Sequence, residues 1–414
     1  MIVDCCNQSS RPKHEIADIF RQAGHRFLEK FNASYEQIKV LNKIIVCRTA
    51  ALGGHIDFCT NCDHQQNAYN SCRNRHCPKC QTITKEKWLI DRQSELLPAT
   101  YYHLVFTLPH DLNPVILCNM RLLLNLLFSS VNRTIKQFSA DPQWRLQGKP
   151  GFIGVLHTWS QTILDHFHLH CLVPGGVLSE DRTTWTPSKK NYLFKTRSLV
   201  NAFKGIYIKG LKELYKAGDL KFPGNTGKYG TSAGFNRLIK IIRKKKWSGY
   251  AKSPCSGPEK VLEYLGRYTH RVAISNHRIK SFENGKVVFT WKDRAQDNTT
   301  KEMTLDAVEF TRRFLLHVLP KGFKKIRHFG FLSPRYKTQN IQLIRQLVQN
   351  DSEDKADPRP DDEPLEIMMQ RLTGINIRAC PKCGKGRLAR IYKLLPVYVD
   401  YILPSQKEDA WNTS

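Results

Sequence analysis

The spacing of apolar residues predicts helices and strands through most of the first 320 residues. Apolar side chains recur every three or four residues between 14 and 50, which predicts two helices there. The same periodicity predicts helices at about 84–97, 114–139, 196–216, 233–246, 258–269 and 305–318. Strands are expected at 101–108, 152–159 and 166–173. A hairpin is expected over 271–291, where Asn284-Gly285 separates two alternating segments.

Two segments lack this periodicity and suggest boundaries. Residues 51–82 are rich in Cys, Asn and Gly, which suits a small metal-stapled module, and 351–366 is acidic with three prolines, which reads as a linker. We therefore expect an α+β protein with three parts. They are N-terminal helices with a zinc-binding module (1–98, the zinc knuckle at about 47–82), a main domain (99–345), and a C-terminal tail (346–414).

The charge balance indicates a polyanionic partner. Lys and Arg total 65 against 36 Asp and Glu, a net charge of +29, and nucleic acid is the first candidate. No apolar run approaches the ~18 residues of a membrane span. The first six residues lack the apolar centre of a signal peptide. We expect a cytoplasmic protein with no membrane partner, whose 13 cysteines include metal ligands rather than a disulfide framework.

Two CxxC pairs predict a zinc site. Cys59 and Cys62 form the first pair, Cys77 and Cys80 form the second, and 14 residues separate the two pairs. Two such pairs supply four thiolates, the ligand set of a closed structural zinc site. Because four cysteines leave no open coordination position, this site would not be catalytic.

Other cysteines and histidines around these pairs leave a second zinc site open. Its candidate ligands are Cys47, His55, Cys72 and His76, and alternate pairs along the chain would give two interleaved sites. In the simpler alternative, Cys47 is a buried helix residue and His76 faces DNA. Cys380 and Cys383 form half a site, which Cys5 and Cys6 or another chain could complete.

Basic residues cluster at two places. Arg73, Arg75 and Lys79 lie around the second CxxC, where a rigid knuckle would present them to phosphates. The predicted helix at 233–246 ends in Lys244, Lys245 and Lys246, followed by Trp247. This end is a candidate for backbone contact and base stacking, although a solvated basic helix face is an equal alternative.

The segment from His166 to Val173 carries the most specific pattern. In a strand, His166, His168 and His170 share one face, while Phe167, Leu169 and Cys171 share the other. Imidazole is a common metal ligand and a poor strand filler, so three alternating histidines with an apolar back favour a metal site.

The pair His168-Leu169-His170 resembles the HUH endonucleases, which include rolling-circle replication initiators, conjugative relaxases and certain transposases. In that group two histidines and a further polar residue hold a divalent metal. His157, 11 residues before His168 on the preceding predicted strand, is our choice for the third ligand. Gln161 and Asp165 remain alternatives.

This resemblance requires a nucleophilic tyrosine. Tyr264 and Tyr268 are four residues apart and would share one face of the predicted helix. An aromatic pair packed in the core is the alternative. Arg267 and Arg271, in the same segment, are further candidates for DNA contact.

The combined pattern resembles the zinc-binding, two-tyrosine rolling-circle transposases of bacterial insertion sequences over nearly the whole chain. The matching segments are 47–55, 69–80, the histidine strand, 264–276 and 312–322. The family commonly has Pro where this chain has Phe167, and some relatives keep only one tyrosine.

The resemblance implies an antiparallel-sheet HUH endonuclease domain with helices, preceded by the helical and zinc-binding module. Strand 101–108 would neighbour the histidine strand, and the tyrosines would lie on a facing helix. It further implies nicking and joining of single-stranded DNA through a 5′-phosphotyrosine, with structural Zn²⁺ and catalytic Mg²⁺ or Mn²⁺, in association with a bacterial nucleoid. The oligomeric state stays open.

Three rival functions are compatible with parts of this pattern. A plasmid replication initiator or relaxase would share the chemistry, but the N-terminal zinc module favours a transposase. A non-catalytic zinc-dependent DNA-binding protein would not need the histidines and tyrosines. A zinc hydrolase would need a carboxylate base, and only Asp165 lies close in sequence.

Overall fold

The computed structural model describes residues 12–189, 193–255, 266, 272–293, 295–349, 364–374 and 376–399. The fold is α+β with antiparallel sheets, as predicted. The chain divides into two compact units. Residues 1–84, 272–318 and 357–414 form unit 1, and residues 85–271 and 319–356 form unit 2.

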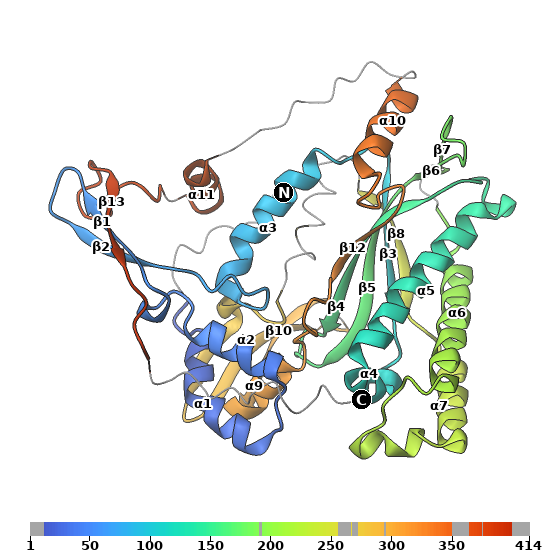
Figure 1. Cartoon of the computed structure of the whole chain (residues 1–414), viewed down its shortest axis with the longest axis horizontal. Coiled ribbons are helices and arrows are strands. Elements are labelled where there is room, and N and C mark those ends of the chain that lie inside the picture. The colour runs from blue at the N-terminus through green and yellow to red at the C-terminus, as the bar shows by residue number, and fades with distance from the viewer. Residues whose placement is uncertain are drawn as a thin grey trace. The chain divides into compact units, whose positions relative to one another are not determined.

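Unit 2 is built on a five-stranded antiparallel sheet with the order β12-β4-β5-β3-β8 (Figure 1). Its strands are β3 (Tyr101–Thr107), β4 (Gly151–Trp159), β5 (Asp165–Pro174), β8 (Gly249–Cys255) and β12 (Ile326–Gly330). The predicted histidine strand is β5, at the centre of the sheet, and β3 is its neighbour, as expected.

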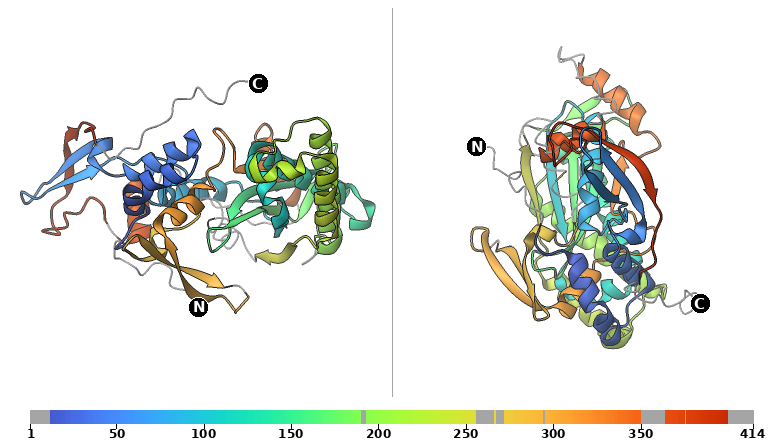
Figure 2. Two further views of the ribbon diagram at one scale, coloured as in Figure 1. Left: turned by 90° about the horizontal axis from the view of Figure 1, so that it is seen from below. Right: turned by 90° about the vertical axis from the view of Figure 1, so that its left-hand side faces the viewer.

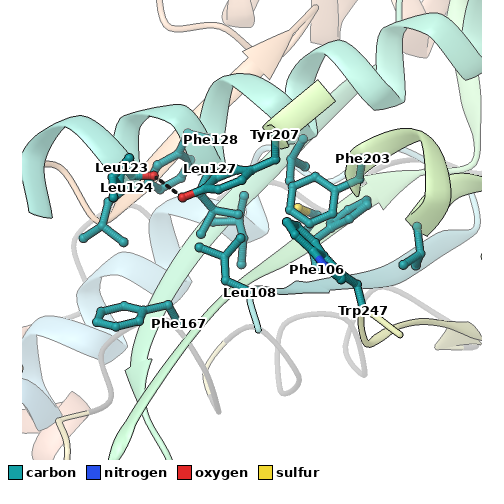
Figure 3. Packing of buried hydrophobic residues seen from close by; sticks show 14 of the residues in the cluster. Phe106, Leu108, Leu123, Leu124, Leu127, Phe128, Phe167, Phe203, Tyr207 and Trp247 are labelled. Atoms are coloured by element: carbon teal, nitrogen blue, oxygen red, sulfur yellow. Dashed lines mark hydrogen bonds between the residues drawn. The ribbon is translucent and has the colours of Figure 1, made fainter. Parts of the chain in front are cut away.

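One face of this sheet packs against helices α4 (Asn113–Cys118), α5 (Met120–Ala140), α6 (Thr196–Lys216) and α7 (Ser232–Lys244). Phe106 from β3 and Phe167 from β5 point into this core (Figure 3), and both are fully buried. Tyr207 joins α6 to α5 because its hydroxyl donates to the Leu123 carbonyl at 3.4 Å. Fully burying one such aromatic side chain contributes roughly 1.5–3 kcal/mol.

The opposite face of the sheet is apolar only toward one end. There Tyr101, Ile153 and Leu172 pack with residues of α10 (Lys337–Gln349). Trp88 and Leu89, near the end of α3 (Pro78–Gln93), pack against the same cluster. A small two-stranded sheet, β6 (Gly176–Leu178) with β7 (Trp185–Pro187), follows β5. The other end of this face carries the histidines.

Unit 1 contains α1 (Ile16–Lys30), α2 (Tyr35–Ile45) and α9 (Ala307–Leu315), whose apolar faces are buried. Phe20 of α1 meets Phe314 of α9 edge to face, with the ring centroids 5.3 Å apart. The sheet β11-β10-β9 joins this core, with β9 (Ile279–Glu283), β10 (Lys286–Asp293) and β11 (Thr299–Asp306). Figure 2 shows these strands as a twisted ribbon in yellow and orange. Asn284 and Gly285, both with positive φ, form the predicted turn.

A second sheet of unit 1 brings together segments from both ends of the chain. Its order is β13-β1-β2, with β1 (Gly54–Cys59), β2 (Gln65–Tyr69) and β13 (Leu388–Leu394). Figure 1 shows β13, in red, alongside the blue β1. Helix α11 (Leu365–Thr373) precedes this C-terminal strand.

Several elements differ from those expected. The helix predicted at 114–139 is broken at Asn119, whose side-chain amide donates to the Val115 and Lys221 carbonyls. Residues 51–82 contain two strands, and helix α3 begins at Pro78 rather than near 84. The division also departs from the expected linear order, because residues 272–318 and the C-terminal segment belong to unit 1. Within the described residues, no helix has the length and apolar character needed to cross a membrane.

Candidate metal centres

Three histidines converge on the histidine-bearing face of the five-stranded sheet. His157 of β4 lies directly opposite His168 of β5, and His170 follows two positions later on the same face. The ligand atoms of these three residues lie within 4.8 Å of one another, and we call them the histidine group. Their separation is compatible with binding to one cation, since Zn–N bonds, for example, are about 2.0–2.1 Å.

Hydrogen bonds fix two of these rings. His168 Nδ1 lies 2.8 Å from the His166 carbonyl oxygen, so in this arrangement Nδ1 carries the proton and Nε2 is left as the ligand atom. His170 Nδ1 lies 2.8 Å from Nε2 of His103, a buried residue of β3. A metal-binding histidine ordinarily uses its second ring nitrogen in this way, which sets its tautomer and orientation.

His103 is a site residue that the sequence reasoning missed. Its position was nevertheless readable from the strand pattern, since His103, Val105 and Thr107 alternate on one face of β3. Thr107 pairs with His168 and Val105 with His170, so this face is shared with the histidine group. His103 could therefore have been found from the sequence, by combining the predicted pairing of strands 101–108 and 166–173 with the alternation of side chains along the first of them.

The other predicted ligand candidates have different surroundings. His166 stacks on His110, with the ring centroids 5.2 Å apart, and is not in the histidine group. Asp165 is also outside the group, and Gln161 lies in the turn between β4 and β5. On the opposite face, burial raises the pKa of the Cys171 thiol well above its usual value, which suits a core residue.

Tyr264, Tyr268, Arg267 and Arg271 lie outside the described residues. Gly266, between the two tyrosines, is described and is helical. A Cβ atom at Gly266 would lie 2.8 Å from Leu89 Cδ1. Leu89 packs with the cluster on the histidine-bearing side of the sheet, so Gly266 lies on that side.

Eight cysteines form two groups of four, in a grouping that differs from the prediction. The N-terminal cysteine group consists of Cys47, Cys72, Cys77 and Cys80. The bridging cysteine group consists of Cys59, Cys62, Cys380 and Cys383. The expected set that joined the two CxxC pairs, Cys59 and Cys62 with Cys77 and Cys80, is therefore not formed. The first pair lies at the end of β1, where β13 and not the second pair is its neighbour.

The N-terminal cysteine group has the spacing of a tetrahedral thiolate site. Cys80 Sγ lies 3.5 Å from Cys47 Sγ and 3.6 Å from Cys72 Sγ. Four Zn–S bonds of 2.3 Å in a tetrahedron put neighbouring sulfurs about 3.8 Å apart. The Cys72 and Cys77 thiols donate to Cys47 and lower its pKa to about 7. The fit therefore favours a closed structural zinc site.

The two histidines predicted as zinc ligands belong to neither cysteine group. His55 lies on β1, where its Nε2 is 3.4 Å from Asp57 Oδ1 and 3.1 Å from an Arg390 guanidinium nitrogen. Alternation along β1 puts His55 and Asp57 on one face. His76 lies just before Cys77, and its backbone N–H donates to Asn74 Oδ1 at 2.8 Å. The second predicted ligand set was thus wrong in His55 and His76, while Cys47 and Cys72 do belong to one group.

The basic candidates near the N-terminal cysteine group are unequally placed. Arg73 is exposed, whereas burial lowers the pKa of Arg75. The Lys79 ammonium lies 2.6 Å from a Glu15 carboxylate oxygen, so its charge is already paired. Arg73 is therefore the best placed of the three for a phosphate contact.

The basic end of α7 is exposed at Lys244, Lys245 and Lys246. Lys245 pairs with Asp111 at 2.7 Å. Trp247, expected as a base-stacking residue, is instead 4% exposed and packs against Phe203. Its indole N–H donates to the Ile242 carbonyl, so this residue completes the core and the stacking role was wrongly predicted.

Comparison with known proteins identifies the family. A model described as "Putative transposase" matches residues 151–340, and a model described as "Transposase zinc-binding domain" matches residues 19–108. The chain is 42% identical over 387 residues to "Putative transposase y4qJ" of Sinorhizobium fredii, covering 92% of this chain and 96% of that protein. The chain belongs to the IS91/IS801 family of transposases.

A second relative extends this relationship. The chain is 28% identical over 318 residues to "Transposase for insertion sequence element IS801" of Pseudomonas savastanoi pv. phaseolicola, covering 75% of this chain and 74% of that protein. No solved structure matches the chain. The histidine group lies within the matched transposase region, and the N-terminal cysteine group lies within the matched zinc-binding region of this transposase. Cys380 and Cys383 lie in neither.

Proposed function

We propose that this transposase catalyses rolling-circle transposition of an insertion sequence by nicking and joining single-stranded DNA. The observation that carries the proposal is the histidine group, which assembles from two adjacent strands of the central sheet. These three imidazoles from two strands meet on one face of the sheet, and imidazole is a common metal ligand. The net charge of +29 supports a nucleic-acid substrate.

The histidine group would hold the catalytic Mg²⁺ or Mn²⁺. When bound, that ion supplies Lewis-acid polarisation of the scissile phosphate. His168 offers Nε2, because its Nδ1 faces the His166 carbonyl. His103 orients His170 through the 2.8 Å contact between their ring nitrogens. Imidazole ligands alone would suit softer metals better. Oxygen atoms of the DNA substrate would add the oxygen ligands that a hard cation such as Mg²⁺ prefers.

A tyrosine hydroxyl would then form the covalent intermediate. The hydroxyl gives up its proton as its oxygen bonds to phosphorus, the bond from phosphorus to the 3′-oxygen breaks, and the 3′-oxygen takes up a proton. The product is a 5′-phosphotyrosine with a free 3′-hydroxyl. The phosphodiester energy is retained in this link, so rejoining requires no nucleotide cofactor. Tyr264 and Tyr268 are the proposed nucleophiles, and the position of Gly266 beside Leu89 supports a location on the histidine-bearing side of the sheet.

The deciding experiment is an assay for the covalent adduct. The purified chain is incubated with labelled single-stranded DNA of the element's ends and Mn²⁺, then denatured and separated by size. A labelled band at the mass of protein plus DNA supports the proposal. Absence of adduct with either end strand, from protein that binds both strands, would contradict it.

The two tyrosines give a graded prediction. Tyr264→Phe and Tyr268→Phe should each retain some adduct, whereas the double variant should form none. Phe keeps the ring and therefore its packing, which separates a chemical role from a structural one. Joining of two DNA ends should fall in both single variants, because it requires two covalent links. Tyr336→Phe, at an exposed tyrosine outside the histidine group, is the matched control.

Other outcomes of this series identify other mechanisms. If one single variant loses all adduct, that tyrosine alone is the nucleophile. If the double variant still forms adduct, the tyrosines are a packed pair and the nucleophile lies elsewhere.

His103→Gln should weaken metal binding without removing the metal ligands. Loss of a partner that orients a metal-bound histidine typically costs about 10–100-fold in metal affinity or activity. We therefore expect the Mn²⁺ concentration for half-maximal adduct formation to rise by about that factor, with the rate largely recovered at saturating Mn²⁺. His328→Gln, on the edge strand β12, is the control. An unchanged Mn²⁺ dependence in His103→Gln would remove His103 from the site.

A further inference from the structure

The bridging cysteine group joins two CxxC motifs from opposite ends of the chain. Cys59 Sγ lies 3.7 Å from Cys383 Sγ, and Cys62 Sγ lies 3.8 Å from Cys380 Sγ. All four are free thiols whose sulfurs lie within 4.8 Å of one another. These separations match the spacing of about 3.8 Å between sulfurs around a tetrahedral zinc ion.

A backbone N–H group points at a cysteine sulfur in each of the two motifs. The Asn61 N–H donates to Cys59 Sγ and the Gly386 N–H donates to Cys383 Sγ, both at 3.3 Å. Donors aimed at a sulfur stabilise its anionic form.

Two glycines make the close approach of the C-terminal motif feasible. Gly384 has a φ of +66°, a conformation that L side chains rarely adopt. A Cβ at Gly386 would lie 2.3 Å from Cys59 Sγ, so no larger residue fits between the two motifs. The sequence Cys380-x2-Cys383-Gly384-x-Gly386 is therefore adapted to receive a second CxxC.

Strand pairing holds the two motifs in register. β1 pairs antiparallel with β13, with Cys59 opposite Leu388. Beyond the strands, the Thr60 N–H donates to the Arg387 carbonyl and the Arg387 N–H donates to Thr60 Oγ1, at 2.9 and 3.0 Å. Yet β13 contributes little core, since all its residues except the first and last are exposed. Hydrogen bonds alone are weak support for such an exposed sheet.

We propose that Cys59, Cys62, Cys380 and Cys383 bind a second structural zinc ion, which fastens the C-terminal segment to the β1–β2 hairpin. This site shares no cysteine with the N-terminal cysteine group, so the chain carries two zinc ions. Four thiolates leave no open position, and the ion has no part in catalysis. It closes a loop between Cys62 and Cys380, which are 318 positions apart, and replaces the hydrophobic core that this small sheet lacks.

Zinc counting on the full chain tests the proposal. Wild-type protein should release two zinc ions per chain, and Cys380→Ser/Cys383→Ser should release one. Cys118→Ser is the matched control, because Cys118 belongs to α4 and to neither group, and it should keep two. A wild-type content of one zinc, or two in the double variant, would overturn the proposal.

Thiol alkylation of wild-type protein gives a second readout that does not depend on the variant being soluble. Peptides containing Cys380 and Cys383 should resist alkylation in zinc-loaded protein and react after chelation. Free reaction before chelation counts against the site. Molar mass in solution tests the source of the ligands: a dimer that dissociates in the double variant would show that two chains share the ion and would contradict the single-chain site. None of these readouts requires DNA cleavage, so they stand apart from the proposed transposition chemistry.

Discussion

His168→Ala or His170→Ala should abolish DNA cleavage while leaving single-stranded DNA binding largely intact. Removing one imidazole from the histidine group would remove the metal, which contributes several kcal/mol of transition-state stabilisation and hence about a thousandfold or more in rate. Binding depends instead on many phosphate contacts made by a chain of net charge +29.

The measurement compares adduct formation and DNA affinity in the same buffer. Adduct is quantified at saturating Mn²⁺, and affinity is measured by fluorescence anisotropy at fixed salt, because electrostatic binding varies strongly with salt. His328→Ala is the matched control: His328 lies on strand β12 of the same sheet and is not in the histidine group. Cleavage at the wild-type rate by His168→Ala or His170→Ala would rule out the metal assignment. Loss of DNA affinity together with cleavage would point to misfolding instead.

Cys77→Ser should yield insoluble or zinc-poor protein. Cys77 is fully buried and its sulfur lies 3.6 Å from Cys47 Sγ, so a serine leaves three thiolates around a buried hydroxyl. Structural zinc contributes about 10–16 kcal/mol in isolated zinc-finger peptides, which is comparable with the whole stability of a domain, about 5–15 kcal/mol. The loss should therefore unfold at least the N-terminal module.

Soluble yield, zinc per chain and thermal unfolding check this expectation. Cys118→Ser again serves as the control, since it removes a thiol that lies in neither cysteine group. Soluble wild-type protein that is active yet contains no zinc would refute the zinc assignment of the N-terminal cysteine group. Cys77→Ser that retains full zinc and full stability would place the ligand elsewhere.

The spacing of apolar residues and the turn residues were enough to predict those helices and turns whose formation depends on residues close together in the chain. Helix α6 begins and ends where the apolar spacing predicts, and Asn284-Gly285 forms the expected turn, because both signals lie within a few residues. Strands β8, β12 and β13 were not predicted. Their pairing partners are distant in sequence, and strands of five to seven residues carry little pattern of their own. Strand β11, which pairs with the neighbouring β10, was also not predicted.

The sequence by itself also determined the histidine strand. Alternation fixes which side chains share a face of one strand, and two neighbouring predicted strands then brought His157 to His168. It also predicted that the CxxC cysteines would gather into metal-binding sets, since a CxxC motif places two thiols where one ion could bind both. It left the pairing of these motifs undetermined, because a CxxC motif carries no information about which other pair completes its tetrahedron.

Only the tertiary structure decided that pairing. Antiparallel registration of β1 with β13 puts Cys380 and Cys383 beside the first CxxC, while Cys47 and Cys72 complete the second. Only the tertiary structure likewise shows that Trp247 is buried in the core. It also shows that His103, on a neighbouring strand, contacts His170. Each of these outcomes depends on contacts between residues far apart in the chain, and such contacts form only when the sheets assemble.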